Sequence, residues 1–389
     1  MKKLRSTHIV NLVLIILSAI ILIWITYLPG FIGLCRWNPI YSRILITLWV
    51  TVFILGLLFI ISLIDFKNKK ITQIGKVASL IISSLLTIFL IGMFLYLVIP
   101  TFSKVEDRYL VNEINGKNLN INGDSKLSFA VSSDPHWGSE NSNTQVTNQI
   151  LRDINNQDYD AFLCLGDVSE LGSIETYYKD ATTYIKENLE NTPIHVILGN
   201  HDALINGTKY FKKYFQRDLN NFYSRFDYDN IHIITLNLLW DAQEFDKVQE
   251  NWLIEQLESI PKEDMTIVLS HCFAYCSGYY DTKSKRNWYD NEDVINEVTP
   301  ILEKYDVELM ISGHNHLMEL LKNNNTHYAV VGTMGGKLDS ERDYTSPNSI
   351  WLDTEHYGYM DLEVYRDYLE ITFKDQNSNT LYNTRIENN

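Results

Sequence analysis

Residues 309–320 read LMISGHNHLMEL, an apolar run that ends in Ser312 and Gly313 and then places two histidines one residue apart. In an extended chain, residues two apart point to the same side, so His314 and His316 can present two imidazoles to one small volume. A lone histidine at the end of an apolar strand is usually structural. The pair therefore indicates a metal site only if the chain supplies further ligands.

The surrounding sequence predicts a layered α/β domain. Apolar runs that end in loops predict strands at 126–136, 160–167, 193–202, 230–237, 265–271 and 307–316. Helical spacing between them predicts helices at 144–157, 174–189, 248–259 and 294–305. Three further strands, expected to be antiparallel, are predicted at 328–333, 357–365 and 368–375.

Side chains that can bind metals follow five of these strands. They are Asp134, His136, Asp167, Asn200, His201, His271, His314 and His316. Active sites of layered α/β proteins gather where strands end, so we expect these residues to be neighbours in space. The remaining histidines are expected to be structural: His8, His195, His232, His327 and His356.

The blocks DPH, LGD, LGNHD, SH and SGHNH, in this order, resemble the calcineurin-like metallophosphoesterase superfamily. The stretches VQENWLIEQL and SHCFAYCSG look like its purple-acid-phosphatase-like branch. The resemblance covers about 126–375 and implies a four-layer α/β/β/α sandwich. Purple acid phosphatases carry a tyrosine ligand three residues after the bridging aspartate, where this chain has Glu170, so no iron-tyrosinate centre is expected.

The resemblance also implies roles for single residues. One metal would be held by Asp134, His136 and His316, a second by Asn200, His271 and His314, with Asp167 bridging both. Hydroxide shared by the two metals would hydrolyse a phosphate ester, with His201 as the catalytic histidine. Asp202 either orients His201 or caps the loop. The N/O ligand set without thiolate fits two divalent or trivalent ions, Mn, Fe, Zn or Co.

Residues 1–100 differ from the rest and predict a membrane anchor. Three apolar runs, 9–28, 44–64 and 77–99, are each long enough to cross a bilayer as a helix and contain no charged residue or histidine. A cleaved signal peptide fits the first run poorly because it is long and no cleavage site follows. Lysine and arginine are enriched before the first run and between the second and third, which predicts an extracytoplasmic C-terminal region.

The predicted organisation is therefore a membrane anchor at 1–100, a connector at 101–125 and a metallophosphoesterase domain at 126–389. Of the 33 basic and 48 acidic residues, 24 and 47 follow Pro100, a formal charge of −23. Such a domain is not expected to bind nucleic-acid polymers. The three cysteines after Pro100 do not form a disulfide framework, and Cys272 could pair with Cys276 only if the loop folds back.

Three functions remain open: an esterase for small phosphate esters, a phosphodiesterase or pyrophosphatase acting on lipid or nucleotide headgroups near the bilayer, and a non-catalytic metal-bound module. The presence of His201 beside the ligand set argues against the last. The segment 272–293 contains Lys283, Lys285 and Arg286 and is either a substrate-binding loop or a solvated surface loop.

Overall fold

The computed structural model describes residues 6–28, 31, 35, 39–63, 69–99, 127–215, 221–228, 230–282 and 285–388. These residues fall into two compact units, one made of three long helices and one containing the sheets. The predicted connector at 101–125 lies outside the described residues, as does Lys283.

The helical unit consists of α1 (Ser6–Thr26), α3 (Pro39–Ser62) and α4 (Lys69–Val98). Each contains a span of 20 to 26 residues that is apolar enough to cross a membrane, which confirms the prediction of three such helices. Large apolar side chains remain exposed on this unit, including Phe53 at 66% and Ile88 at 67%. A surface of this kind suits a lipid environment.

Buried polar residues join α1 to α4. The Asn11 side-chain amide donates to Ser79 Oγ at 2.9 Å, and Ser83 Oγ donates to the Asn11 carbonyl oxygen. One helical turn or more away, Ser18 and Thr87 share a hydrogen bond of 2.9 Å. Since small and hydroxyl-bearing residues permit close helix approach in membranes, these bonds set the register of α1 against α4.

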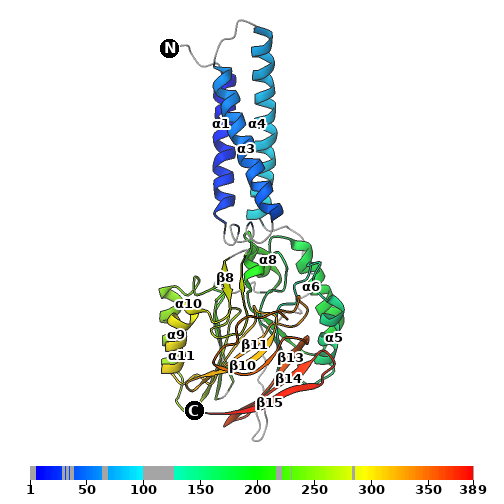
Figure 1. The fold of residues 1–389 in the computed structure, drawn as a ribbon, viewed down its shortest axis with the longest axis vertical. Helices are drawn as coiled ribbons and strands as arrows, with labels where there is room; N and C mark the ends of the chain where they lie inside the picture. Colours follow the sequence, from blue (N-terminus) through cyan, green and yellow to red (C-terminus); the bar gives the residue numbers. More distant parts are fainter. Residues whose placement is uncertain are drawn as a thin grey trace. The chain divides into compact units, whose positions relative to one another are not determined.

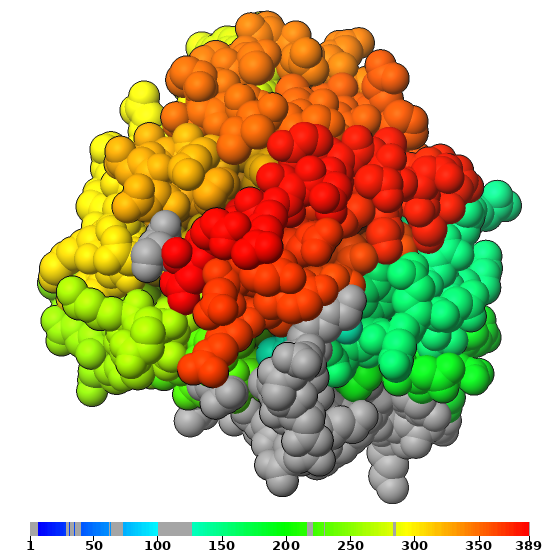
Figure 2. Space-filling model, turned by 90° about the horizontal axis from the view of Figure 1, so that it is seen from below, coloured from blue at the N-terminus to red at the C-terminus, as the bar shows by residue number. Residues whose placement is uncertain are grey.

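The second unit contains two large sheets. The six-stranded sheet has the order β15-β14-β13-β1-β2-β3. Its strands are β1 (Leu127–Ser132), β2 (Ala161–Cys164), β3 (Ile194–Val196), β13 (Gly358–Val364), β14 (Tyr368–Asp375) and β15 (Thr380–Glu387). Strands β1, β2 and β3 are parallel, whereas β13, β14 and β15 add antiparallel pairs at the other side. Figure 2 shows these C-terminal strands, in red, crossing one face of the molecule.

The seven-stranded sheet has the order β12-β10-β11-β9-β6-β5-β4. Its strands are β4 (Ser224–Tyr228), β5 (Ile231–Thr235), β6 (Met265–Leu269), β9 (Leu309–Ser312), β10 (Met318–Asn323), β11 (Thr326–Val331) and β12 (Ser349–Asp353). Strands β5, β6 and β9 are parallel neighbours. A separate hairpin pairs β7 (Tyr279–Asp281) with β8 (Arg286–Trp288).

The sheets pack face to face with helices on both outer faces. Apolar residues from both sheets, such as Phe129, Ile267 and Phe373, form one buried core. A second core lies under α5 (Thr144–Asn155), α6 (Glu175–Asn188) and α8 (Thr208–Tyr214), and a third under α9 (Lys247–Glu258), α10 (Glu292–Glu297) and α11 (Thr299–Lys304). Figure 1 shows α5 and α6 on one side of the sheets and α9, α10 and α11 on the other. This confirms the predicted four-layer α/β/β/α fold.

Two local predictions differ from the structure. The single helix expected at 294–305 is two helices, α10 and α11, that meet at Val298. Pro300 stands at the start of α11, where its missing N–H is tolerated, but it cannot continue a preceding helix. Strands β4, β7, β8, β10, β12 and β15 were not predicted, because a strand depends on its pairing with neighbouring strands more than on local sequence preference.

Candidate metal centre

The predicted ligands come together because strands from both sheets end at the same place. Asp134 and His136 follow β1, Asp167 follows β2, Asn200 begins α7 (Asn200–Ala203) after β3, His271 follows β6, and His314 and His316 follow β9. Three groups of their side chains place ligand atoms within 4.8 Å of one another. The groups are Asp134, His136 and His316; His136, Asp167 and His201; and Asp167, His271 and His314.

In the first group two imidazoles face each other. His136 Nε2 lies 3.1 Å from His316 Nε2, and Asp134 Oδ1 lies 3.7 Å and 3.5 Å from these two nitrogens. Asp134 is fully buried, and among the described residues its Oδ1 atom has no hydrogen-bond partner. Since a buried carboxylate oxygen without a partner is costly, its position next to two ring nitrogens fits a cation site.

Hydrogen bonds outside the group fix which nitrogens are free. His136 Nδ1 lies 2.9 Å from Glu170 Oε2, and His316 Nδ1 lies 2.7 Å from the Lys337 carbonyl oxygen. Both oxygens accept, so each Nδ1 carries the hydrogen and a neutral ring leaves a lone pair on Nε2. Two lone pairs facing each other at 3.1 Å repel unless a cation or a proton lies between them.

A second set of possible ligand atoms, on Asn200, His271 and His314, is oriented in a similar way. His271 Nδ1 donates to the Leu165 carbonyl oxygen at 2.8 Å, which turns its Nε2 lone pair toward Asn200 Oδ1 at 2.7 Å. His314 Nδ1 lies 2.8 Å from the same amide oxygen and 3.2 Å from His271 Nε2. Three atoms that can act as ligands thus converge, and the donor set of amide oxygen and imidazole suits a transition metal.

Asp167 lies between the first group and the set formed by Asn200, His271 and His314. Its Oδ2 atom is 3.6 Å from His136 Nε2 and 3.4 Å from His271 Nε2, and its side chain is 2% exposed. Its other oxygen accepts the backbone N–H of His201 at 2.8 Å. A carboxylate in this position can contribute to both groups, which is the arrangement that a bridging ligand requires.

The loops that carry these residues have unusual backbone geometry. The φ angles are 60° at Asp134, 47° at His136, 50° at Asp167 and 72° at His314. Non-glycine residues in the left-handed region are uncommon, and strained positions of this kind cluster at functional sites. Gly199 allows a close approach of two of these loops, since an added Cβ would lie 2.1 Å from the Asp167 backbone nitrogen.

The buried charges shift one another's pKa. Burial would raise the pKa of Asp167, but the imidazoles of His271 and His201 hold it well below its usual range. Burial would lower the pKa of His271, but Asp167 and Asp134 raise it to about 9. The carboxylates therefore favour positive charge at the ring nitrogens, and a proton and a metal ion would compete for it.

His201 lies beside both groups. Its ring packs edge-on against His136 with 4.6 Å between centroids, and its Nδ1 donates to the Glu170 carbonyl oxygen at 2.7 Å. This bond leaves Nε2 as the ring atom that can accept or deliver a proton.

Among the described residues, the hydrogen bonds of Asp202 go to loop backbone and to Tyr178, and not to the His201 ring. Its buried carboxylate accepts backbone N–H groups of Val168, Ser169 and Gly199 at 2.9–3.2 Å, and the Tyr178 hydroxyl at 3.0 Å. Burial and the charge of Asp167 raise the pKa of Asp202 to about 7. These contacts tie together the loops after β2 and β3, as a loop-capping aspartate does, while the ring of His201 bonds to Glu170.

Several residues at the centre were not predicted. Glu170 contacts both His136 and His201, and Asp339 accepts the His316 backbone N–H at 2.9 Å. Only Glu170 had a sequence signal, as the position where purple acid phosphatases carry tyrosine. Among the described histidines expected to be structural, His195 is buried against Phe226 and His232 bonds to Asp227 and Asp264. The four cysteines are free.

Comparison with known proteins finds relatives of the sheet-containing unit. Residues 127–318 match the family model described as calcineurin-like phosphoesterase. Purple acid phosphatase 22 of Arabidopsis thaliana is 26% identical over 194 residues, which cover 46% of this chain and 43% of that protein. The chain thus spans less than half the length of this curated relative.

Two solved structures share the fold. Purple acid phosphatase PPD1 from yellow lupin (Lupinus luteus) seeds has a TM-score of 0.56 and 16% identity, covering 68% of this chain and 54% of its own. GAP50, the anchor in the inner membrane complex of Plasmodium, has a TM-score of 0.52 and 17% identity, covering 68% and 89%. These two likenesses concern the fold alone. The match shows that residues 127–318 of the chain form a calcineurin-like phosphoesterase domain.

Proposed function

We propose that the chain is a membrane-anchored phosphoesterase that hydrolyses phosphate esters at a centre for two metal ions. The observation that carries the proposal is the convergence of imidazole nitrogens on the buried carboxylates of Asp134 and Asp167, with Asp167 close to both His136 and His271. We assign one metal to Asp134, His136 and His316, and the other to Asn200, His271 and His314. Two bound ions would supply positive charge to phosphoryl oxygens and acidify water.

The protein groups contribute orientation and a proton. Glu170, Lys337 and Leu165 fix the rings of His136, His316 and His271 through Nδ1, so these rings need no reorientation to bind a cation. His201 would carry its second proton on Nε2 and donate it to a phosphoryl oxygen or to the leaving alkoxide. The backbone N–H bond from His201 to Asp167 keeps the ring at a fixed place beside the centre.

An anchor would hold the reaction at a membrane, and the lysine pattern supports an extracytoplasmic centre. Small phosphate esters, or lipid and nucleotide headgroups, are the substrates that such a position would offer. The three candidate spans support the anchor. Protease protection of a C-terminal tag on intact cells tests the orientation, and a tag that is cleaved only after lysis would overturn it.

The activity is tested with three variants of the full chain: Asp167→Asn, His201→Ala and the control His356→Ala. His356 bonds to Asp353 at 2.9 Å and is half-exposed, so it controls for loss of a histidine. Metal content and hydrolysis of monoester, diester and pyrophosphate model substrates are measured with added Mn.

We expect Asp167→Asn to reduce both metals, because one carboxylate serves both groups. We expect His201→Ala to retain metal and lose turnover, and His356→Ala to resemble the unmodified protein. Loss of metal from the His201 variant as complete as that from the Asp167 variant would contradict the division of roles. Metal binding without hydrolysis of any substrate would show a non-catalytic module.

A further inference from the structure

Two indoles and a guanidinium group, which we name the Trp–Arg wall, lie beside the candidate centre: Trp240, Trp288 and Arg286. The His314 ring lies 5.2 Å from the Trp288 ring and 6.0 Å from the Trp240 ring, and Trp240 is also 6.4 Å from His201. The Arg286 guanidinium carbon lies 5.6 Å from the Trp240 ring centroid and 5.9 Å from that of Trp288. Arg286 and His314 therefore pack against the same two indoles.

The hairpin that carries the wall is fastened to the centre itself. Asn315, the residue between the two predicted ligand histidines, is 1% exposed and donates its side-chain amide to the Trp288 carbonyl oxygen at 2.9 Å. The start of the hairpin is held by the Gly278 N–H, which donates to the Tyr344 carbonyl oxygen at 3.0 Å. Arg286 and Trp288 are two residues apart on β8, so they share one face of the hairpin.

The guanidinium has hydrogens left to donate. Arg286 pairs with the Asp241 carboxylate, and Asn291 donates to the other Asp241 oxygen at 3.1 Å. A guanidinium has five N–H donors, and among the described residues Asp241 is the acceptor that Arg286 reaches. The Arg286 side chain is 35% exposed, so a ligand can reach part of it.

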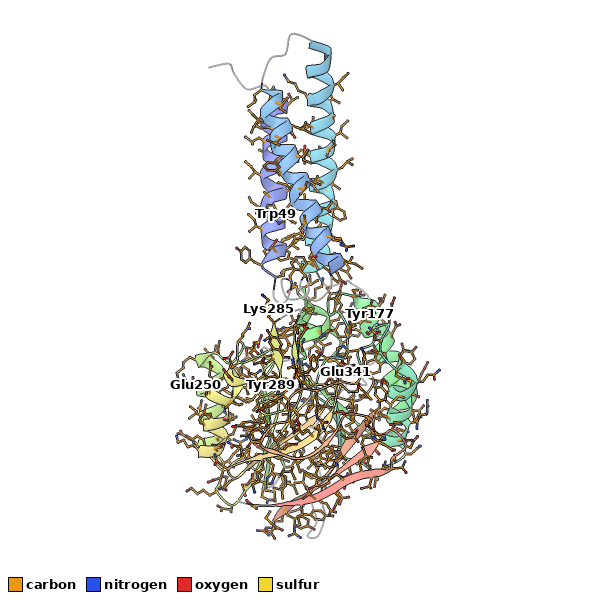
Figure 3. All side chains as sticks on the ribbon, in the orientation of Figure 1. Trp49, Tyr177, Glu250, Lys285, Tyr289 and Glu341 are labelled. Atoms are coloured by element: carbon orange, nitrogen blue, oxygen red, sulfur yellow. The ribbon has the colours of Figure 1, made fainter. Side chains whose placement is uncertain are left out.

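Two basic residues that are adjacent in the sequence, Lys285 and Arg286, have different surroundings in the structure. Lys285 is exposed at the tip of the hairpin (Figure 3), whereas Arg286 packs on the two indoles next to the centre. Because Asp241 balances its charge, Arg286 exerts little long-range attraction. It can recognise an anion only through directed hydrogen bonds, which guanidinium forms with phosphate in a planar, bidentate way.

We propose that the Trp–Arg wall is a specificity site for a second phosphate group on the same substrate, one that is not cleaved while Arg286 holds it. The inference rests on the proposed function, because the first phosphate would lie at the metal centre. The indoles hold the guanidinium in place through cation–π contacts, and its exposed part donates to the distal phosphate. The substrate class is therefore a small organic bisphosphate.

The test compares fructose 1,6-bisphosphate with fructose 6-phosphate, which share an alkyl leaving group and differ in the second phosphate. The KM of each is measured for the unmodified full chain with Mn, for Arg286→Gln and for Lys285→Gln. The two variants remove the same charge at adjacent positions. Calorimetric binding of both sugars to the same three proteins gives a readout that does not require turnover.

The unmodified protein and Lys285→Gln should bind the bisphosphate about tenfold or more tightly than the monophosphate, and Arg286→Gln should lose this preference. Equal loss in both variants, or no preference in the unmodified protein, would overturn the proposal. If neither sugar is hydrolysed but binding still shows a preference that depends on Arg286, the proposed function is wrong and the inference about the Trp–Arg wall is supported. Hydrolysis of both sugars with equal KM would support the proposed function and overturn the inference about the Trp–Arg wall.

Discussion

Replacement of Glu170 by alanine should weaken one metal and spare the other. Glu170 Oε2 accepts from His136 Nδ1 at 2.9 Å, and its side chain is 22% exposed. Burial would raise the pKa of Glu170, but its hydrogen bond with His136 and the charge of His201 lower it, so the group is a carboxylate at neutral pH. The variant removes the acceptor that orients His136.

The size of the effect follows from the contact. Loss of a hydrogen-bond partner of a metal-binding imidazole typically reduces metal affinity about 10- to 100-fold. Water can reach the partly exposed position and replace the acceptor, which favours the lower end, about tenfold or 1.4 kcal/mol. Glu170→Gln keeps an acceptor oxygen and loses only the charge, so we expect a smaller loss.

Metal content is measured after dialysis against a series of free Mn concentrations, with the exposed Glu355→Ala as control. We expect one of two metal equivalents to shift in Glu170→Ala, because the group of Asn200, His271 and His314 has its own partners. If both equivalents weaken equally, or if neither changes, the assignment of Glu170 to His136 is wrong.

Three further outcomes are expected. Burial lowers the pKa of His195 to about 4, so between pH 7 and pH 5 the unfolded chain binds a proton that the folded chain excludes. The free energy of unfolding should therefore fall by about 2 kcal/mol over this range. Denaturant titration of His195→Leu at both pH values should show a loss that is smaller by this amount. A chelator should lower the unfolding temperature and Mn should restore it, since removal leaves buried carboxylates and imidazoles facing one another; an unchanged temperature would contradict a resident metal. Gly199→Ala should lower metal content and stability, because its Cβ would meet the Asp167 backbone. Gly75→Ala, with open space around the added Cβ, should change neither when metal content and unfolding are measured for both variants.

Much of the architecture was accessible from local pattern. Apolar runs ending in Gly, Asp and His located β1, β2, β3, β6 and β9, and the same punctuation placed every predicted ligand at a strand end. The three apolar helices follow from length and composition alone. The division of 294–305 into α10 and α11 was also readable from Pro300, although the helical spacing around it masked the break. These features are local because periodicity and backbone restrictions act within a few residues.

Relations between distant segments were decided by the tertiary structure. That β3 of one sheet and β6 of the other end at the same place depends on how two sheets stack, which no local pattern encodes. The choice of ring nitrogen depends on Glu170, Lys337 and Leu165, whose carbonyl or carboxylate oxygens meet the histidines only in the folded chain. Arg286 and Lys285 are equivalent in sequence, yet strand alternation and packing on two indoles place only Arg286 beside the centre. Residue types at strand ends therefore determined the candidate chemistry, and the packing of the layers determined its geometry, because contacts between distant segments form only when the cores are buried.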